Sequence, residues 1–298
     1  MAEILSRPEK AFQVLNNALM VLLIGVTLYP FWYVLILSIN NPSDTAFGGV
    51  YFWPRRFTLV NYLLILQDSA VLRTFLLSVA RIAAHVPSHL LVTGMAAYAL
   101  SRKEFRIRKP FITMFFITLL FNGGLIPTYL LINDLRLLNT FWVYVLPHLF
   151  LAWNFVIIKT VMQTSIPESL IEAALIDGAN HFFIFTKIVV PLSTAVLATI
   201  GLFQAVNHWN DWFWGAYYVF DDHLIPLQTY LQRLIRQAYM TEQELAYMAE
   251  NATEIDLIIT PKSLTMAAVI VATGPIILVY PWIQKYFMKG IRLGSIKG

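Results

Sequence analysis

Long apolar segments follow one another along most of the chain, and each is bounded by a short polar stretch. Six segments are long enough for a helix to cross a bilayer, which takes roughly 20 residues for about 30 Å of hydrocarbon. They run from 17 to 39, 72 to 100, 110 to 132, 139 to 162, 192 to 220 and 263 to 284. The pattern therefore predicts an all-α membrane protein with six transmembrane helices.

The composition agrees with a chain that lies mostly in lipid. Of its 298 residues, 58% are hydrophobic and 13% are charged, whereas a soluble domain carries about 25% charged residues. The absence of cysteine excludes disulfides and thiol chemistry. The basic residues behind the net charge of +4 lie beside the apolar segments, so they indicate membrane orientation and no nucleic-acid partner.

The distribution of Lys and Arg predicts the orientation. The short connection 102–109 carries five of them, and such a connection stays in the cytoplasm. Both termini of this cell-membrane protein are then expected in the cytoplasm. The predicted organisation is a cytoplasmic segment 1–16, a six-span domain 17–290 and a cytoplasmic tail 291–298, with a cytoplasmic loop 164–191 and an outer loop 221–262.

The cytoplasmic loop reads as two short helices. Ser165 and Glu168 have the spacing of a capping box, with Pro167 early in the first helix. Gly178 suits a left-handed position after that helix. A second helix is expected from about Asn180 to a stop before Pro191. Spacing alone leaves two interpretations open, a bent knob that contacts another protein and an amphipathic helix on the lipid surface.

The residue types in this loop favour the first interpretation. They are Glu172, Ala173 and Ala174, then Gly178, Ile188 and Pro191, with Val190 before the proline. This pattern resembles the "EAA loop" of ATP-binding-cassette (ABC) importer permeases, in which leucine is usual before the proline. The resemblance implies that the loop docks on a separate ATPase subunit. The residues implied in that coupling are Glu172, Ala173, Ala174, Asp177 and Gly178.

Three further stretches, 121–142, 209–214 and 284–298, are similar to carbohydrate importer permeases of the maltose-transporter type. The first looks like the subgroup that serves complex or uronate-containing oligosaccharides such as alginate. The resemblance implies the type I importer permease fold and transport of an oligosaccharide. It also implies a second permease, two ATPase subunits that hold ATP and Mg²⁺, and an extracytoplasmic solute-binding protein.

The chain itself carries no motif for catalysis. No phosphate-binding G-x-x-x-x-G-K-[ST] loop, H-E-x-x-H pair or G-x-S-x-G elbow occurs in it. We therefore expect no catalytic residue, no metal site and no cofactor in this chain, and any ATP hydrolysis must take place in a partner.

Polar residues near the outer end of the fifth apolar segment are candidates for the sugar pathway. They are Asn207, Asn210, Asp211 and Trp212. Polar groups at membrane depth are costly without a partner, which favours a pathway or a subunit interface. For Tyr217 and Tyr218 an interfacial aromatic belt is the favoured interpretation.

A polar stripe follows one face of the second apolar segment. Ser78, Arg81, His85 and His89 recur at spacings of three or four residues. Arg81 and Asp211 lie at matching depths of about 12 and 14 Å from the outer side, so a pair between them is a hypothesis. Two interpretations of the stripe stay open. It either lines the pathway, or it packs against the partner permease with Arg81 snorkelling outward.

The outer loop 221–262 contains an amphipathic pattern and seven acidic residues. Leu227, Tyr230, Leu231, Leu234 and Ile235 recur at helical spacing. This helix either packs on its own transporter or reaches the solute-binding protein.

Three other functions compete with sugar import. An ion-coupled transporter or channel needs intramembrane charges, of which Arg81 and Asp211 are the candidates besides histidines. An ABC permease for a non-sugar solute would share the EAA-like loop, but the C-terminal stretch 284–298 argues against it. An intramembrane enzyme is disfavoured because the histidines form no recognisable nucleophile or metal-binding arrangement.

Overall fold

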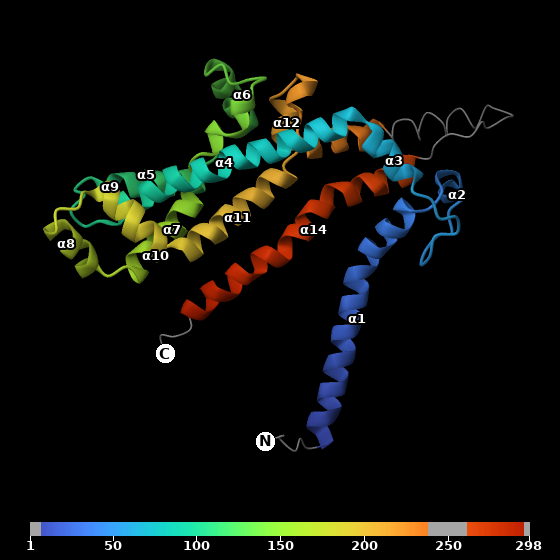
Figure 1. Ribbon diagram of the computed structural model, residues 1–298, viewed down its shortest axis with the longest axis horizontal. Helices are drawn as coiled ribbons and strands as arrows, with labels where there is room; N and C mark the ends of the chain where they lie inside the picture. The colour runs from blue at the N-terminus through green and yellow to red at the C-terminus, as the bar shows by residue number, and fades with distance from the viewer. Residues whose placement is uncertain (1–6, 238–260, 295–298) are drawn as a thin grey trace. The chain divides into compact units, whose positions relative to one another are not determined.

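The computed structural model describes the backbone of residues 7–237 and 261–294, and the side chains of 8–237 and 262–278. The chain divides into two compact units (Figure 1). Unit 1 comprises 1–69 and 231–274, and unit 2 comprises 70–230 and 275–298. The described elements are helical, and the one extended pairing among them is an isolated bridge between Asn40 and Phe57.

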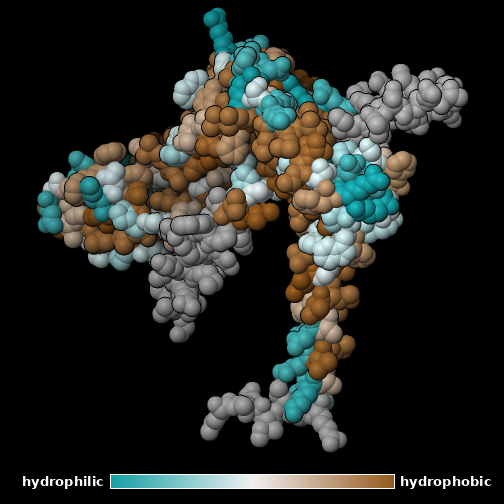
Figure 2. Space-filling view, turned by 45° about the vertical axis from the view of Figure 1, so that its right-hand side comes forward, coloured by the Kyte–Doolittle hydropathy of each residue, from teal (hydrophilic) through white to brown (hydrophobic). Residues whose placement is uncertain are grey.

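Unit 1 begins with α1 (Arg7–Ser38), followed by α2 (Pro42–Ala46) and α3 (Val60–Gln67). Most of α1 is exposed and apolar, with polar residues near its N-terminal end (Figure 2). Such a helix is suited to lipid. Buried amides hold the other end: Asn61 Nδ2 donates to the carbonyl oxygens of Ser38 at 2.9 Å and Asn40 at 3.1 Å. Ser263, in the first turn of α14 (Pro261–Gly294), donates to Asn61 Oδ1.

Unit 2 is organised along α4 (Ser69–Ser101), which packs closely against α11 (Thr194–Asn210). A Cβ on Gly201 of α11 would lie 3.0 Å from Leu90 Cδ1 of α4, so a small residue allows this approach. One core cluster gathers Ala97, Phe155, Ile158, Met162 and Ile184 with their neighbours. A second is built around Val143, Tyr144 and Tyr218.

The remaining helices of unit 2 are short. They are α5 (Arg108–Leu120), α6 (Leu125–Asp134), the 3-10 turns η1 (Phe141–Tyr144) and η2 (Leu146–His148), α7 (Ala152–Ser165), α8 (Glu168–Ile176), α9 (His181–Ile184), the π-helical turn η3 (Phe185–Val189), α10 (Val190–Leu192), α12 (Phe213–Tyr217) and η4 (Asp222–Leu224).

Membrane-length helices are fewer than the six apolar segments predict. Among the described residues two helices are long and apolar enough to cross, or up to four if each bent pair forms one span. One pair, Phe141–His148 with Ala152–Ser165, bends by 48°. The other, His181–Leu192 with Thr194–Asn210, bends by 81°. The described part of α14 contains a shorter apolar helix, Lys262–Leu278.

The predicted helix 139–162 is interrupted as η1, η2 and α7, and two other predicted continuous helices are interrupted as well. The segment 110–132 forms α5 and α6, because Gly124 has φ 83° and Asn122 Oδ1 accepts from its N–H at 2.9 Å. The segment 192–220 forms α11 and α12, because the Asp211 Oδ1 atom accepts from the backbone N–H of Phe213, the first residue of α12, at 3.1 Å. Polar side chains inside apolar segments thus bond to backbone that a continuous helix would use.

Candidate functional site

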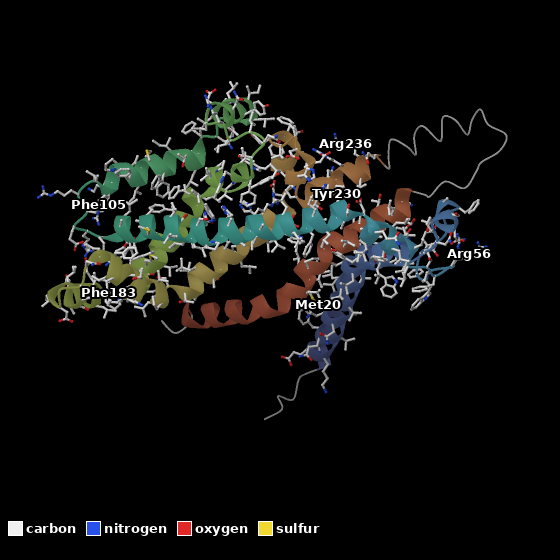
Figure 3. The ribbon with its side chains drawn as sticks, turned by 45° about the horizontal axis from the view of Figure 1, so that its top comes forward. Met20, Arg56, Phe105, Phe183, Tyr230 and Arg236 are labelled. Carbon is white, nitrogen blue, oxygen red and sulfur yellow. The ribbon has the colours of Figure 1, made fainter. Side chains whose placement is uncertain are left out.

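The bent knob is formed by α8 and α9, at the end of unit 2 that also carries Phe105 and Phe183 (Figure 3). The expected capping box is absent, since Ser165 lies in the last turn of α7 and Pro167 precedes α8 without a side-chain cap bond. The reason is that a residue before proline avoids the helical region. Ile166 is extended, with φ −110° and ψ 112°, and it therefore ends α7.

The first acidic residue of α8 has a different partner from the one expected. Glu168 Oε2 lies 2.6 Å from Lys103 Nζ, on the connection after α4. This hydrogen-bonded ion pair lowers the pKa of the Glu168 carboxyl and raises the pKa of the Lys103 ammonium. The two side chains are 41% and 72% exposed, so water screens the pair and its contribution to stability is small.

The turn between the two helices is the one that the sequence predicts. Gly178 has φ 83°, and Ala179 N donates to Ala174 O at 3.0 Å while Gly178 N donates to Leu175 O at 3.0 Å. These two bonds define a Schellman motif. Asn180 then caps α9 by accepting from Phe183 N at 2.8 Å. The helical turns continue to Leu192 instead of stopping before Pro191; the wider π turn of η3 before the proline relieves its clash with the preceding turn.

The surface of the knob is open and partly apolar. Ala174 packs on the core beside buried Ile171, whereas Glu172, Ala173, Asp177 and Gly178 are exposed. Glu172 makes no hydrogen bond or ion pair with another described residue. Large apolar side chains are also exposed on the knob, since Ile176 is 86% and Phe182 is 63% exposed. An unpaired carboxylate beside exposed apolar side chains is suited to a protein partner.

The hypothesised ion pair is present inside unit 2. Arg81 Nη1 lies 3.1 Å from Asp211 Oδ2, and Nη2 donates to the carbonyl oxygens of Asp211 and His208. Arg81 also lies over the Tyr144 ring, with 5.2 Å from the guanidinium carbon to the ring centroid. The guanidinium thus ties α4 to the interrupted end of α11, where free carbonyl groups need donors.

The rest of the polar stripe continues this seam. His85 Nε2 donates to Gln204 Oε1 at 3.3 Å, and its ring centroid lies 3.7 Å from that of His208. His89 Nδ1 donates to the His148 carbonyl at 3.0 Å, and its Nε2 accepts from Asn154 Nδ2 at 2.9 Å. The described residues contain no group of three or more His, Cys, Asp or Glu residues placed to hold a metal ion.

Burial changes the interpretation of the stripe. Ser78, Arg81, His85 and His89 are at most 1% exposed within the single chain. Packing against a partner with Arg81 snorkelling outward is therefore wrong, because other parts of the same chain cover these side chains. Leu227 N donates to Ser78, Arg81 lies over the Tyr144 ring, and His85 and His89 bond to Gln204 and Asn154. Their partners Gln204, His208 and His148 were not among the candidate residues of the sequence analysis, and a role of the stripe in the pathway stays a prediction. Gln204 and His208 are four residues apart, so the same helical spacing could have revealed them.

The other pathway candidates are open. Asn207 and Asn210 are exposed on α11, and Trp212 follows at the break with 37% exposure. Asp211 is partly buried, with 22% of its side chain exposed. A contact of these residues with sugar stays a prediction.

Tyr218 is not part of an interfacial belt. It is 1% exposed and stacks on Trp214 with 4.4 Å between ring centroids. Its carbonyl accepts from Asn139 N at 2.8 Å. Tyr217 is exposed, as a belt residue would be.

The outer loop begins with the predicted helix, which runs from 227 to 237. Its start packs within unit 2, since Leu227 and Thr229 are buried and a Cβ on Gly215 of α12 would clash with Thr229 Oγ1. This part therefore packs on its own chain. The five acidic residues at 242–256 lie outside the described residues.

These features define the type I ABC importer permease fold: a helical membrane domain with an exposed bent knob between two of its helices. The chain belongs to the family described as binding-protein-dependent transport system inner membrane component, whose model matches residues 58–293.

Relatives and a solved structure cover nearly the whole chain. The polygalacturonan/rhamnogalacturonan transport system permease protein YtcP of Bacillus subtilis (strain 168) is 33% identical over 97% of this chain and 99% of its own. Protein LplC of the same organism is 33% identical over 92% of this chain and 90% of its own. A chain of a bacterial ABC transporter involved in import of the acidic polysaccharide alginate superposes with a TM-score of 0.84, at 29% identity, over 96% of this chain and 100% of that chain.

Proposed function

We propose that this chain is the membrane-spanning permease subunit of an ATP-driven importer that moves oligosaccharides, acidic ones included, from a solute-binding protein into the cytoplasm. The observation that carries the proposal is similarity along the full chain to two proteins whose names specify uronate-containing polymers. No comparison supports an ion-coupled transporter or an intramembrane enzyme.

The knob supplies the mechanical contact with a separate ATPase. Glu172 is unpaired on the surface, and Gly178 fixes the bend through its positive φ. Closure of two ATPase subunits around ATP and Mg²⁺ would move α8 and α9 as a body, and the attached helices would transmit that movement. In this arrangement both termini and the knob lie in the cytoplasm, and a second permease completes the pathway.

Substrate contacts belong to the open face of α11 and the break that follows it. Asn207 and Asn210 offer amide donors and acceptors, and Trp212 offers an aromatic face, which together suit sugar hydroxyl groups and rings. Arg81 does not contact the sugar itself. Its ion pair with Asp211, made from the buried side, holds the break between α11 and α12 in place.

Uptake by the reconstituted complex tests the proposal. Vesicles containing this chain with its second permease and ATPase subunits should take up labelled oligogalacturonate when the binding protein and ATP are present. Removal of ATP or of the binding protein should abolish uptake. Uptake driven by an ion gradient without ATP would contradict the proposal, and so would ATP-driven uptake limited to non-sugar solutes.

A further inference from the structure

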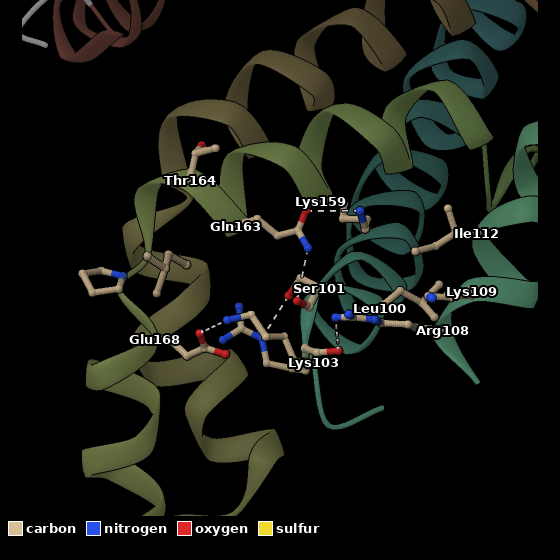
Figure 4. A pocket seen from close by; sticks show the side chains of 13 residues that line it. Leu100, Ser101, Lys103, Arg108, Lys109, Ile112, Lys159, Gln163, Thr164 and Glu168 are labelled. Atoms are coloured by element: carbon tan, nitrogen blue, oxygen red, sulfur yellow. Dashed lines mark hydrogen bonds and ion pairs between the residues drawn. The ribbon is translucent and has the colours of Figure 1, made fainter. Parts of the chain in front are cut away.

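A basic pocket of about 640 Å³ lies in unit 2, where α4 ends and α5, α7 and α8 come together (Figure 4). Its wall contains five of the chain's 21 Lys and Arg residues. They are Arg102, Lys103, Arg108, Lys109 and Lys159. Two helices, α5 and α7, and the connection after α4 thus direct positive charge to one place.

The wall does not neutralise this charge. Glu168 is the one carboxylate among the lining residues, and it pairs with Lys103 at 2.6 Å. Neutral oxygens are the recorded partners of three other cations: Ser101 Oγ for Arg102 at 3.0 Å, the Arg102 carbonyl for Arg108 at 3.2 Å and Gln163 Oε1 for Lys159 at 3.2 Å. Like charges gathered in one pocket repel each other, so an anion from outside would be favoured there.

The pocket continues into an apolar surface. Ile112 lines it one turn after Arg108, and α5 has no buried residue along its length. Further along the same helix Phe116 is 48% and Ile117 is 51% exposed. A ligand that fits both parts carries an anionic group on an apolar body.

We propose that this pocket binds the phosphate of an anionic phospholipid, with the acyl chains along α5. Basic pockets between membrane helices bind such headgroups through charge-assisted hydrogen bonds. A soluble phosphate compound shares the headgroup chemistry but gains nothing from α5. The binding does not depend on which solute is transported.

The pocket also adjoins the knob. Pro167 and Glu168, at the start of α8, form part of the wall. A bound phosphate would compete with Glu168 for Lys103, so that lipid occupancy would alter one of the contacts that hold α8.

Native mass spectrometry of the assembled transporter, titrated with phosphatidylglycerol or phosphatidylcholine, tests the proposal. The wild-type complex should retain phosphatidylglycerol in preference to phosphatidylcholine. Arg108→Gln with Lys159→Gln should weaken that retention about thirtyfold, since each basic residue that reaches the bound anionic headgroup contributes about a factor of five. The matched control is Lys10→Gln with Arg106→Gln, which removes two exposed cations outside the pocket and should change retention less than about twofold.

Two further variants keep the outcome decisive. Arg108→Lys with Lys159→Arg keeps the charge and should retain the lipid. Lys109→Gln, at an exposed position, should weaken phosphatidylglycerol retention about fivefold, and it serves even if the neutralising double variant does not assemble. Inorganic phosphate should displace phosphatidylglycerol only at a large excess. Equal retention by the pocket and control variants would overturn the proposal. Displacement by stoichiometric phosphate would assign the pocket to a soluble compound instead.

Discussion

Arg81 is a charged side chain that the fold can bury because both of its Nη atoms have acceptors, although its Nε has no hydrogen-bond partner among the described residues. Its guanidinium group contacts a carboxylate, two carbonyl groups and the Tyr144 ring. Removal of one partner from a buried pair leaves an uncompensated charge, which costs about 3–5 kcal/mol. The partial exposure of Asp211 places this pair toward the lower end of that range.

The Arg81–Asp211 pair therefore predicts strong coupling in a double-mutant cycle. Arg81→Ala and Asp211→Ala should each destabilise the assembled complex by about 2–4 kcal/mol, and the double variant should lose at least about 1 kcal/mol less than the sum. Thermal unfolding of the purified complex measures the stability, and exposed Arg106→Ala is the control. Additive effects would show that the two residues are not coupled.

Asn139 is a second residue at which a side chain holds separate segments together. Its φ is 56°, and its Oδ1 accepts from Phe220 N at 2.8 Å and from Asp221 N at 2.7 Å. The positive φ disfavours most side chains, and the two bonds satisfy backbone groups that follow α12. Conformation and hydrogen bonding can be separated by substitution.

We expect stability to decrease from the wild-type Asn139 through the Asp and Gly variants to the Ala variant. Asn139→Asp keeps the acceptor oxygen of both hydrogen bonds and should cost less than about 1 kcal/mol. Asn139→Gly loses two bonds but tolerates the φ, and Asn139→Ala adds about 1 kcal/mol of backbone strain to that loss. Thermal unfolding ranks the three variants. An alanine variant as stable as the aspartate variant would refute the assignment.

At the scale of elements, the knob depends on one glycine. A Cβ at Gly178 would meet no atom within 4 Å, so space does not select glycine there. The φ of 83° at Gly178 selects glycine, because a residue with a side chain pays about 1 kcal/mol to adopt the left-handed backbone region.

Gly178→Ala should accordingly reduce substrate-stimulated ATP hydrolysis of the complex, and Gly178→Asn should reduce it less, since asparagine tolerates left-handed backbone. Gly25→Ala is the matched control, because Gly25 lies within α1 in open space. Glu172→Lys should lower the same activity by reversing a charge at the proposed ATPase contact, with normal membrane abundance. Full stimulation in both Gly178→Ala and Glu172→Lys would exclude the knob as the coupling element.

The sequence predicts helices well where apolar composition or a special backbone angle decides. The long helices α1 and α4, the turn at Gly178 and the matching depths of Arg81 and Asp211 follow from such signals. The helix breaks at Gly124 and Asp211 do not follow from such signals, because they depend on which backbone N–H the Asn122 and Asp211 side chains reach. The capping box at Ser165 failed since the restriction before Pro167 outweighed it, and the burial of His85 and His89 depends on which helix covers them.

At the scale of the whole molecule, the open face of α11 requires a partner. Asn207 and Asn210 are exposed on a helix of the membrane domain, where an amide facing lipid would be costly. The knob presents exposed apolar side chains at its end. A single chain thus leaves two surfaces of different chemistry uncovered, one suited to a second membrane subunit and one to a soluble ATPase.

We therefore predict a complex of one copy of this chain, one second permease and two ATPase subunits. Native mass spectrometry of the complex purified with its neighbours should give that composition, and this chain alone should neither bind nor hydrolyse ATP because it lacks a phosphate-binding loop. Asn207→Leu with Asn210→Leu should lower uptake more than Phe203→Leu, a control on the same exposed face. A transport-active homodimer without another permease would refute the composition, since the exposed face of α11 would then be completed by a second copy of itself.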